Sequence, residues 1–219
     1  MNFSATLPSR LRNRGLSMGL LLVALMMGST TAAAQGYDLI DPPQNTSTPD
    51  KVEVIEFFWL GCPHCYAFEP TILKWEKDKP DYVSFSREAP PLNPSWETHS
   101  RSFYAAQLLG KEHEFVDAMF DAIHEQRKNM RKPKDIAKLA ETLGMDPDKF
   151  LKTMKSFAVE TKMRRAIQLA KGAGLTGVPA VMINGKYRTS ASKAGGYPAV
   201  IDVINERSEF EKEEMGLAN

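Results

Sequence analysis

The sequence predicts an α/β protein with a central mixed β-sheet flanked by helices and a long helical segment inserted between its strands. Residues 51–60, KVEVIEFFWL, are nearly continuous in apolar, β-branched and aromatic character, which is typical of a strand buried on both faces. Residues 96–169 follow with helical periodicity, and strand character returns at residues 179–183, PAVMI. We therefore expect one sheet whose strands come from the sequence before and after the helical segment.

The elements before the helical segment follow from local signals. Residues 37–50 are rich in Pro, Asn, Thr and Ser and predict an irregular lead-in to the first strand. Gly61 ends that strand, and apolar residues at helical spacing predict a helix over residues 63–77 that Pro70 should kink. Residues 82–87, YVSFSR, alternate in polarity and predict a second strand.

The helical segment carries its own start and stop signals. An apolar stripe over residues 136–143 ends at Gly144. Asp146 and Pro147 then predict a new helix, with Asp as its N-cap and Pro at its first position. The charged residues of the segment have mixed signs, which favours a solvated face over a binding surface.

A hairpin and a last helix complete the predicted fold. Asn184-Gly185 is the strongest short hairpin signal and should join residues 179–183 to a partner strand at residues 186–188. Residues 198–210, PAVIDVINERSEF, are amphipathic and predict a closing helix.

The charge balance and the cysteine count exclude several classes of protein. Lys and Arg number 28 and Asp and Glu 27, a net charge of +1, which argues against a nucleic-acid-binding protein. The two cysteines are too few for a disulfide scaffold or a four-thiolate zinc site. They are enough for one redox pair.

Residues 1–34 predict a cleaved secretory signal peptide. Three arginines precede a short apolar run at residues 16–27, and small residues end the segment at Ala34. A membrane anchor is the alternative, but a spanning helix needs about 20 apolar residues. Cleavage would remove three arginines and no acidic residue, which changes the net charge from +1 to −2. An exported protein in an oxidising compartment is therefore expected.

Both cysteines lie in the motif Cys62-Pro63-His64-Cys65, directly after the first strand and at the start of the predicted helix. A helix N-terminus offers unpaired N–H groups and the positive end of the helix dipole, which favour a thiolate at Cys62. His64 could add positive charge or a hydrogen bond, and Pro63 suits the first helical turn because it has no N–H to lose. Since a stabilised thiolate favours the reduced form, the motif predicts a disulfide donor.

Other uses of the two cysteines are weaker. If the two cysteines were half of a zinc site, two more ligands would be needed. None of the chain's histidines stands at standard zinc-ligand spacing from them: His64, His99, His113 and His124. A haem attachment site requires His directly after the second cysteine, where this chain has Tyr66. A structural disulfide that closes so short a loop would add little stability. We therefore predict redox chemistry and no metal site.

Glu56 stands between Ile55 and Phe57 in the strand expected to be buried on both faces. An isolated buried carboxylate costs several kcal/mol unless it is paired or protonated. The alternative is an edge position that faces solvent. We favour a buried, functional Glu56 and hypothesise that it passes a proton to or from Cys65 during disulfide exchange.

Val178-Pro179 opens the strand predicted at residues 179–183. Proline is disfavoured there unless its missing N–H is useful or its peptide bond is cis. A plain turn proline is the alternative, and these residues alone favour neither.

Together these residues resemble the DsbA family of secreted thiol–disulfide oxidoreductases. VIEFFWLGCPHCYAFEP is similar to the family's strand, active site and first helix, and GVPAVMINGKY to its cis-proline loop and hairpin. The resemblance covers most of the chain after the signal peptide and implies a thioredoxin fold interrupted by a helical domain. The expected boundaries are residues 35–95 and 168–219 for the thioredoxin-fold domain and residues 96–167 for the helical insertion.

The resemblance also implies roles for the site residues. Cys62 would be the exposed, attacking cysteine and Cys65 the buried, resolving one. His64 would tune the reduction potential, and Glu56 would be the buried acid.

Substrates and partners are implied in the same way. Val178 and Pro179 would present backbone to an extended substrate peptide by strand addition. We expect a monomeric periplasmic enzyme that donates the Cys62–Cys65 disulfide to reduced, unfolded exported proteins. A membrane quinone-linked reoxidase of the DsbB type would restore the disulfide, with no metal or organic cofactor.

Two alternatives stay open. The first is a reductase or isomerase of the same fold, although a dimeric isomerase would need a dimerisation segment where only a short irregular stretch precedes Lys51. The second is a binding protein or holdase whose disulfide is inert.

Overall fold

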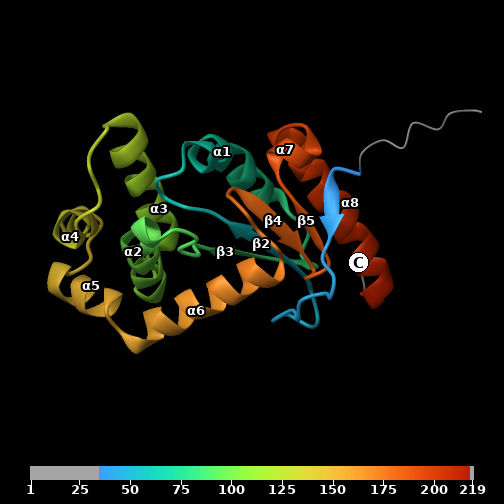
Figure 1. The fold of residues 1–219 in the computed structure, drawn as a ribbon, viewed down its shortest axis with the longest axis horizontal. Helices are drawn as coiled ribbons and strands as arrows, with labels where there is room; N and C mark the ends of the chain where they lie inside the picture. Colours follow the sequence, from blue (N-terminus) through green and yellow to red (C-terminus); the bar gives the residue numbers. More distant parts are fainter. Residues whose placement is uncertain (1–34, 218–219) are drawn as a thin grey trace, which may run out of the picture. The chain divides into compact units, whose positions relative to one another are not determined.

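The computed structural model describes residues 35–217, so the predicted signal peptide, residues 1–34, lies outside the described residues. Five strands of this described part form one sheet in the order β1-β5-β4-β2-β3 (Figure 1). Strands β2 and β3 are parallel, and the other neighbours are antiparallel, which confirms the predicted mixed sheet. The strands are β1 Tyr37–Leu39, β2 Val52–Phe57, β3 Val83–Glu88, β4 Ala180–Ile183 and β5 Tyr187–Thr189.

Strand β2 lies inside the sheet, between β3 and β4, and every one of its residues is buried. Its side chains alternate between two cores, as the pleat of a strand requires. Val52 and Val54 pack with residues of α1 (Pro63–Asp78) and α8 (Tyr197–Met215). Ile55 and Phe57 pack with Ala170 and Ala173 near the end of α6 (Phe157–Gly172). Glu56 therefore shares the α1 side with Val54.

Helices cover both faces of the sheet (Figure 1). Helices α1 and α8 lie on one face with the short α7 (Ala191–Ala194) beside them, and α6 lies along the other. Helix α8 extends to Met215, beyond the predicted end at residue 210, and its C-cap Gly216 adopts the left-handed conformation at φ 64°. Among residues 35–217, no helix is long and apolar enough to span a membrane.

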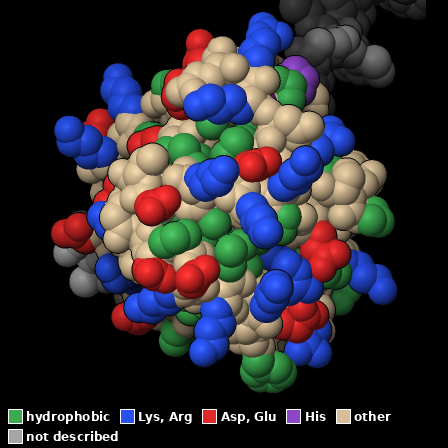
Figure 2. All heavy atoms as spheres, turned by 90° about the vertical axis from the view of Figure 1, so that its left-hand side faces the viewer, with side chains coloured by type: hydrophobic (Ala, Val, Ile, Leu, Met, Phe, Trp, Pro, Cys, Tyr) green, Lys and Arg blue, Asp and Glu red, His purple; other side chains and the backbone are tan. Residues whose placement is uncertain are grey.

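The helical segment between β3 and β4 is confirmed. It contains a short 3₁₀ turn, Pro94–Trp96, then α2 Glu97–Leu108, α3 Glu112–Phe120, a π-helical turn Asp121–Glu125, α4 Pro133–Thr142, α5 Pro147–Met154 and α6. Asp146 caps α5 as predicted, because its Oδ1 accepts from the Lys149 N–H at 2.6 Å. The outer face of this segment shows basic and acidic side chains interspersed (Figure 2).

The core of the helical segment continues into the loop that carries the cysteines. Phe58 and Leu60 at the end of β2 belong to the same buried cluster as Phe103 of α2 and Phe115 of α3. The segment therefore packs directly against the loop before Cys62. The domain boundaries at residues 95/96 and 167/168 stay predictions, and α6 runs across the second of them.

One prediction near the N-terminus is wrong. The composition of residues 37–50 predicts irregular structure throughout, but Tyr37–Leu39 forms the edge strand β1, which pairs antiparallel with β5. Three residues are too few to show an alternating pattern, and the strand exists because β5 offers an unpaired edge. The hairpin prediction is confirmed, since Asn184 and Gly185 both have positive φ, at 47° and 66°.

Candidate active site

Cys62 is the N-cap residue of α1. Strand β2 ends at Phe57, the Cys62 N–H donates to the Trp59 carbonyl, and Pro63 occupies the first turn of the helix. In this position the Cys62 sulfur accepts from the Cys65 backbone N–H at 3.4 Å, as a capping oxygen would. The hydrogen bond from the Cys65 thiol, aided by the backbone N–H groups of Cys65 and His64, lowers the pKa of Cys62 to about 6.

Cys65 has the opposite electrostatic environment. It is completely buried, and burial, followed by its hydrogen bond to Cys62, raises the pKa of its thiol far above the usual value. Both cysteines are in the free thiol form. One thiol of the pair is therefore acidic and the other is held protonated.

The expectation that Cys62 is exposed needs correction. Cys62 retains only 7% exposure, against none for Cys65. The reason is the capping geometry, which turns the Cys62 sulfur towards backbone N–H groups and towards the Val178 carbonyl, 3.6 Å away. Cys62 is thus less exposed than expected but is still the more accessible residue of the pair, and the two thiols differ strongly in acidity.

His64 lies on the exposed first turn of α1. Its positive charge is the smallest of the named influences that lower the pKa of Cys62. Its backbone carbonyl accepts from the Tyr197 hydroxyl at 3.0 Å, which ties the first turn of α1 to the start of α8. Its role in tuning the potential stays a prediction.

The Val178–Pro179 peptide bond is cis, and the loop that carries it faces the cysteines. Cys62 and Val178 are 116 residues apart in the sequence. A depression of about 440 Å³ opens beside them, with His64 and Tyr197 in its lining. An extended peptide laid along this loop would bring its own thiol to Cys62.

A buried charge cluster lies on the α1 side of the sheet. The parallel register places Glu56 opposite Arg87, and the Arg87 Nε donates to Glu56 Oε2 at 2.8 Å. The two terminal nitrogens of Arg87 form a bidentate pair with Glu69 of α1 at 2.9 and 2.5 Å. Burial raises the pKa of Glu56, an effect that Arg87 partly offsets.

The charge cluster has one unmatched charge and one unmatched atom. It holds one guanidinium against two carboxylates, so a net negative charge would be buried if both acids were ionised. Glu56 Oε1 is buried and has no hydrogen-bond partner among residues 35–217. Negative charge on Glu56 is also one of the causes that raise the pKa of Cys65. Glu56 is thus electrostatically coupled to the buried thiol.

The sequence did not single out several residues that hold the site together. The π-helical turn of the insertion places the His124 ring against Tyr66, with ring centroids 4.9 Å apart, and its Nε2 lies 2.9 Å from the Leu60 carbonyl. Trp59 stacks on Trp96 at 4.4 Å. No local signal marks these residues, because each acts through a contact with a distant segment.

Gly61 has a steric role beside the motif. A Cβ at this position would collide with the indole ring of Trp59. Only glycine therefore lets Trp59 fold over the loop just before Cys62.

The described residues hold no cluster of three or more His, Cys, Asp or Glu side chains that could bind a metal ion. The site consists of two thiols of unequal acidity at a helix N-terminus, faced by a cis-proline loop on a mixed sheet. Fold and site together define a thioredoxin-fold thiol–disulfide oxidoreductase.

Comparison with known proteins gives the family. Residues 53–196 match the family model of the DSBA-like thioredoxin domain, and the chain belongs to this family. The thiol:disulfide interchange protein DsbA of Pseudomonas aeruginosa is 39% identical over 181 residues, 83% of this chain and 86% of that protein. DsbA of Burkholderia cepacia is 37% identical over 193 residues, 87% of this chain and 91% of that protein.

Solved structures agree with this assignment. The crystal structure of Pseudomonas aeruginosa DsbA has a TM-score of 0.78 at 38% identity and covers 82% of this chain and 93% of its own. A cysteine-to-serine variant of a Proteus DsbA, solved with a non-covalently bound peptide PWATCDS, has a TM-score of 0.67 at 25% identity and covers 80% of this chain and 96% of its own.

Proposed function

We propose that this protein is a periplasmic dithiol oxidase that donates its Cys62–Cys65 disulfide to newly exported proteins. The observation that carries the proposal is the position of the Cys62 sulfur at the N-cap of α1, where it accepts from the Cys65 N–H, beside the buried Cys65. This arrangement lowers the pKa of Cys62 to about 6 and raises that of Cys65. A thiolate that is stable at neutral pH stabilises the reduced enzyme and makes the disulfide form the stronger oxidant. The predicted signal peptide and the similarity to DsbA proteins support the location.

The exchange proceeds in two steps. A substrate thiolate attacks the Cys62 sulfur, the Cys62–Cys65 bond breaks, and Cys65 leaves as a thiolate that takes up one proton. A second substrate thiolate then attacks the substrate sulfur of the mixed disulfide, and Cys62 leaves as its stable thiolate. The substrate loses two electrons and gains a disulfide, and the enzyme gains those electrons as two reduced cysteines.

Val178 and Pro179 are proposed to hold the substrate. Proline has no backbone N–H, so at this loop the backbone groups of Val178 are the ones that can pair with an extended peptide. The Proteus relative was solved with a bound cysteine-containing peptide, which supports a peptide as the substrate of this chain. The curated relatives are named thiol:disulfide interchange proteins, and a monomer reoxidised by a membrane quinone-linked protein of the DsbB type is our proposal for this chain.

The test is to measure the reduction potential and the Cys62 pKa of the purified protein. We expect the thiolate absorbance to disappear on acidification with a midpoint near pH 6. Relative to a thiol of pKa 9.0, a Cys62 pKa of about 6 stabilises the reduced form at neutral pH by ~1.4 kcal/mol, or ~30 mV. A potential as low as that of thioredoxin, about −270 mV, would contradict the oxidase and favour the reductase. A reduced Cys62 that resists alkylation would favour the inert binding protein.

Glu56 is proposed to give Cys65 its proton when Cys65 leaves, and to take it back on reoxidation. The raised pKa of Glu56 and its unpartnered Oε1 support a proton held at this carboxyl. We expect Glu56→Gln to slow the step in which Cys65 leaves roughly 100-fold and to flatten its pH dependence, measured by stopped-flow exchange.

Glu53→Gln is the matched control for Glu56→Gln. Glu53 is also buried in β2, but it accepts from the Ser47 N–H at 3.0 Å and lies away from the cluster around Arg87. Its replacement should leave the pH profile unchanged. Equal exchange rates for Glu56→Gln and the wild type at every pH would remove Glu56 from the proton path.

A further inference from the structure

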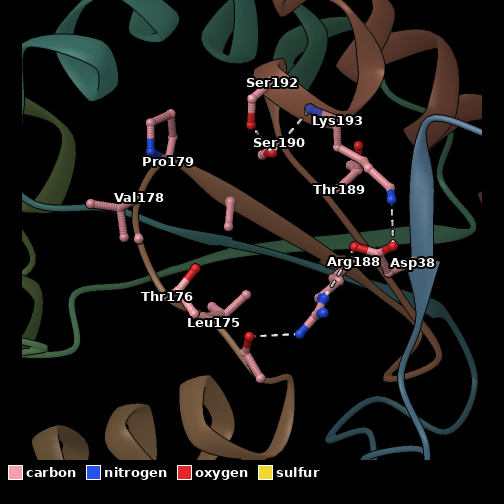
Figure 3. A pocket seen from close by; sticks show the side chains of 13 residues that line it. Asp38, Leu175, Thr176, Val178, Pro179, Arg188, Thr189, Ser190, Ser192 and Lys193 are labelled. Atoms are coloured by element: carbon pink, nitrogen blue, oxygen red, sulfur yellow. Dashed lines mark hydrogen bonds and ion pairs between the residues drawn. The ribbon is translucent and has the colours of Figure 1, made fainter.

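A second depression, of about 310 Å³, adjoins the first along the cis-proline loop. The two share Val178, Pro179, Ser190 and Ser192 in their linings. Figure 3 shows the second depression between the loop that leads to Pro179 and the segment that runs from β5 into α7, with Asp38 of β1 at its far side. The exchange chemistry described above uses none of its charged side chains.

These charged side chains form a linked trio. Lys193 Nζ lies 2.6 Å from Asp38 Oδ1, and Arg188 Nε lies 3.5 Å from Asp38 Oδ2 (Figure 3). The Arg188 Nη1 also donates to the carbonyls of Ala173 and Gly174, both at 2.6 Å, which fixes the guanidinium against the end of α6. Two cations therefore share one carboxylate, and the trio carries a net charge of +1.

The trio has unused hydrogen-bond donors, on Lys193 and Arg188, and its one carboxylate is already paired. Both oxygens of Asp38 face a cation. Within residues 35–217, Lys193 Nζ has Asp38 as its one partner and Arg188 Nη2 has none. The side chains are 33% exposed for Arg188 and 41% for Lys193, so a ligand can reach both. A group that accepts hydrogen bonds and carries negative charge fits this arrangement.

The second depression adjoins the cis-proline loop, so we expect its ligand to be a side chain of the substrate peptide. A peptide paired with the backbone of Val178 has an extended conformation, in which every second side chain faces the same way and residues follow at about 3.3 Å. A residue a few positions from the substrate cysteine would therefore stand over the depression next to the loop. A carboxylate side chain there would meet Lys193 and Arg188.

We propose that this depression is a specificity subsite for an acidic side chain near the substrate cysteine, with Lys193 and Arg188 as donors and Asp38 as the charge that limits their attraction. The inference rests on the proposed function, since it assigns a preference to the same exchange reaction. The side chains are partly exposed, so the preference is modest, and we expect acidic peptides to react roughly two- to fivefold faster than basic ones.

The test uses single-cysteine peptides that differ at one position. Glu, Gln or Lys is placed in turn at each of the positions flanking the cysteine, and the rate of mixed-disulfide formation with the oxidised protein is measured. We expect a Glu-over-Lys preference at one or two positions, weaker in high salt because the charges are partly exposed. Lys193→Gln should remove most of the preference, and Asp38→Asn should increase it. The opposite directions of these two changes separate the proposal from a loss of folding.

Lys138→Gln is the matched control, because it removes the same charge from the exposed surface of α4 in the insertion. It should keep the wild-type preference. The proposal is overturned if Glu and Lys peptides react equally at every position, or if Lys193→Gln and Asp38→Asn change the preference no more than Lys138→Gln does. In both cases peptides still react and the oxidase function stands. If no peptide reacts, the proposed function itself fails.

Discussion

Cys62→Ser should abolish disulfide donation, and Cys65→Ser should trap the enzyme as a stable mixed disulfide with substrate. A serine at position 62 cannot supply the sulfur that the substrate thiolate attacks. In Cys65→Ser, the Cys62 thiolate attacks an activated single-cysteine peptide whose sulfur is joined to a small thiol by a disulfide. The Cys62–peptide disulfide forms and the small thiol leaves, and neither the enzyme nor the peptide has a second thiol that can release the bound peptide. Non-reducing gels and intact mass spectrometry measure both outcomes, with a reduced dithiol substrate for Cys62→Ser and the activated peptide for Cys65→Ser.

The pair Cys65→Ser and Cys65→Ala separates the causes of the Cys62 acidity. The largest cause is the hydrogen bond from the Cys65 side chain. A serine hydroxyl can still donate to the Cys62 sulfur, whereas alanine cannot. We therefore expect the pKa of Cys62 to rise more in Cys65→Ala than in Cys65→Ser, as followed by thiolate absorbance. Equal values in the two variants would assign the acidity to the backbone N–H groups of the helix instead.

Arg87→Met should lower the free energy of unfolding by about 3–5 kcal/mol at neutral pH, the usual effect of leaving buried charges unpaired. Arg87 is 2% exposed and is the one cation paired with both Glu56 and Glu69 in the described structure. Its guanidinium also lies over Phe58, with the guanidinium carbon 4.3 Å from the ring centroid. Methionine has an unbranched apolar side chain that fills much of the space of the arginine stem, so the loss measured by denaturant unfolding reports mainly the missing guanidinium.

The sign of the pH dependence distinguishes this mechanism from a packing defect. Burial already raises the pKa of Glu56, and without Arg87 the shift grows. A carboxyl whose pKa is raised in the folded state binds its proton more tightly there, so stability falls as pH rises from the unfolded pKa through the folded one. Arg87→Met should therefore be least destabilised near pH ~5 and most destabilised near pH ~8.

Arg87→Lys and a double variant control the same experiment. Lysine keeps the charge but cannot form the bidentate pair with Glu69, so an intermediate loss is expected. Glu56→Gln added to Arg87→Met should recover part of the stability, because it removes one of the unpaired carboxylates. A pH-independent loss, or no recovery in the double variant, would show that Arg87 stabilises the fold by packing alone.

Local signals in the sequence predict most elements correctly because their causes lie within a few residues. The apolar run around Ile55, the cap at Asp146 and the turn at Asn184-Gly185 each act on their own neighbourhood, and the structure confirms all three. The strand at residues 37–39 escapes prediction because its cause lies on β5, about 150 positions further along the chain.

The residues of the site also fall into two groups, those that local sequence signals predict and those that depend on long-range contacts. Strand, glycine and Cys-Pro-His-Cys together place a reactive sulfur at a helix N-terminus, and this follows from the order of residues alone. The cis-proline loop opposite Cys62 is expected only through a family resemblance. The pairing of Glu56 with Arg87 is not expected, although both positions are predicted strand residues, because it depends on the parallel register of those strands.

The chemistry of this protein follows from residues that are neighbours in the chain: an acidic thiol at a strand–helix junction with one partner cysteine three residues on. What surrounds that thiol follows from long-range contacts. These contacts bring Val178 to Cys62, pair Arg87 with two acids near Cys65, and set Asp38 between Lys193 and Arg188. The reason is physical, because capping and turn formation depend on neighbours in sequence. Strand register and helix docking depend on burying one apolar surface against another, wherever in the chain each arises.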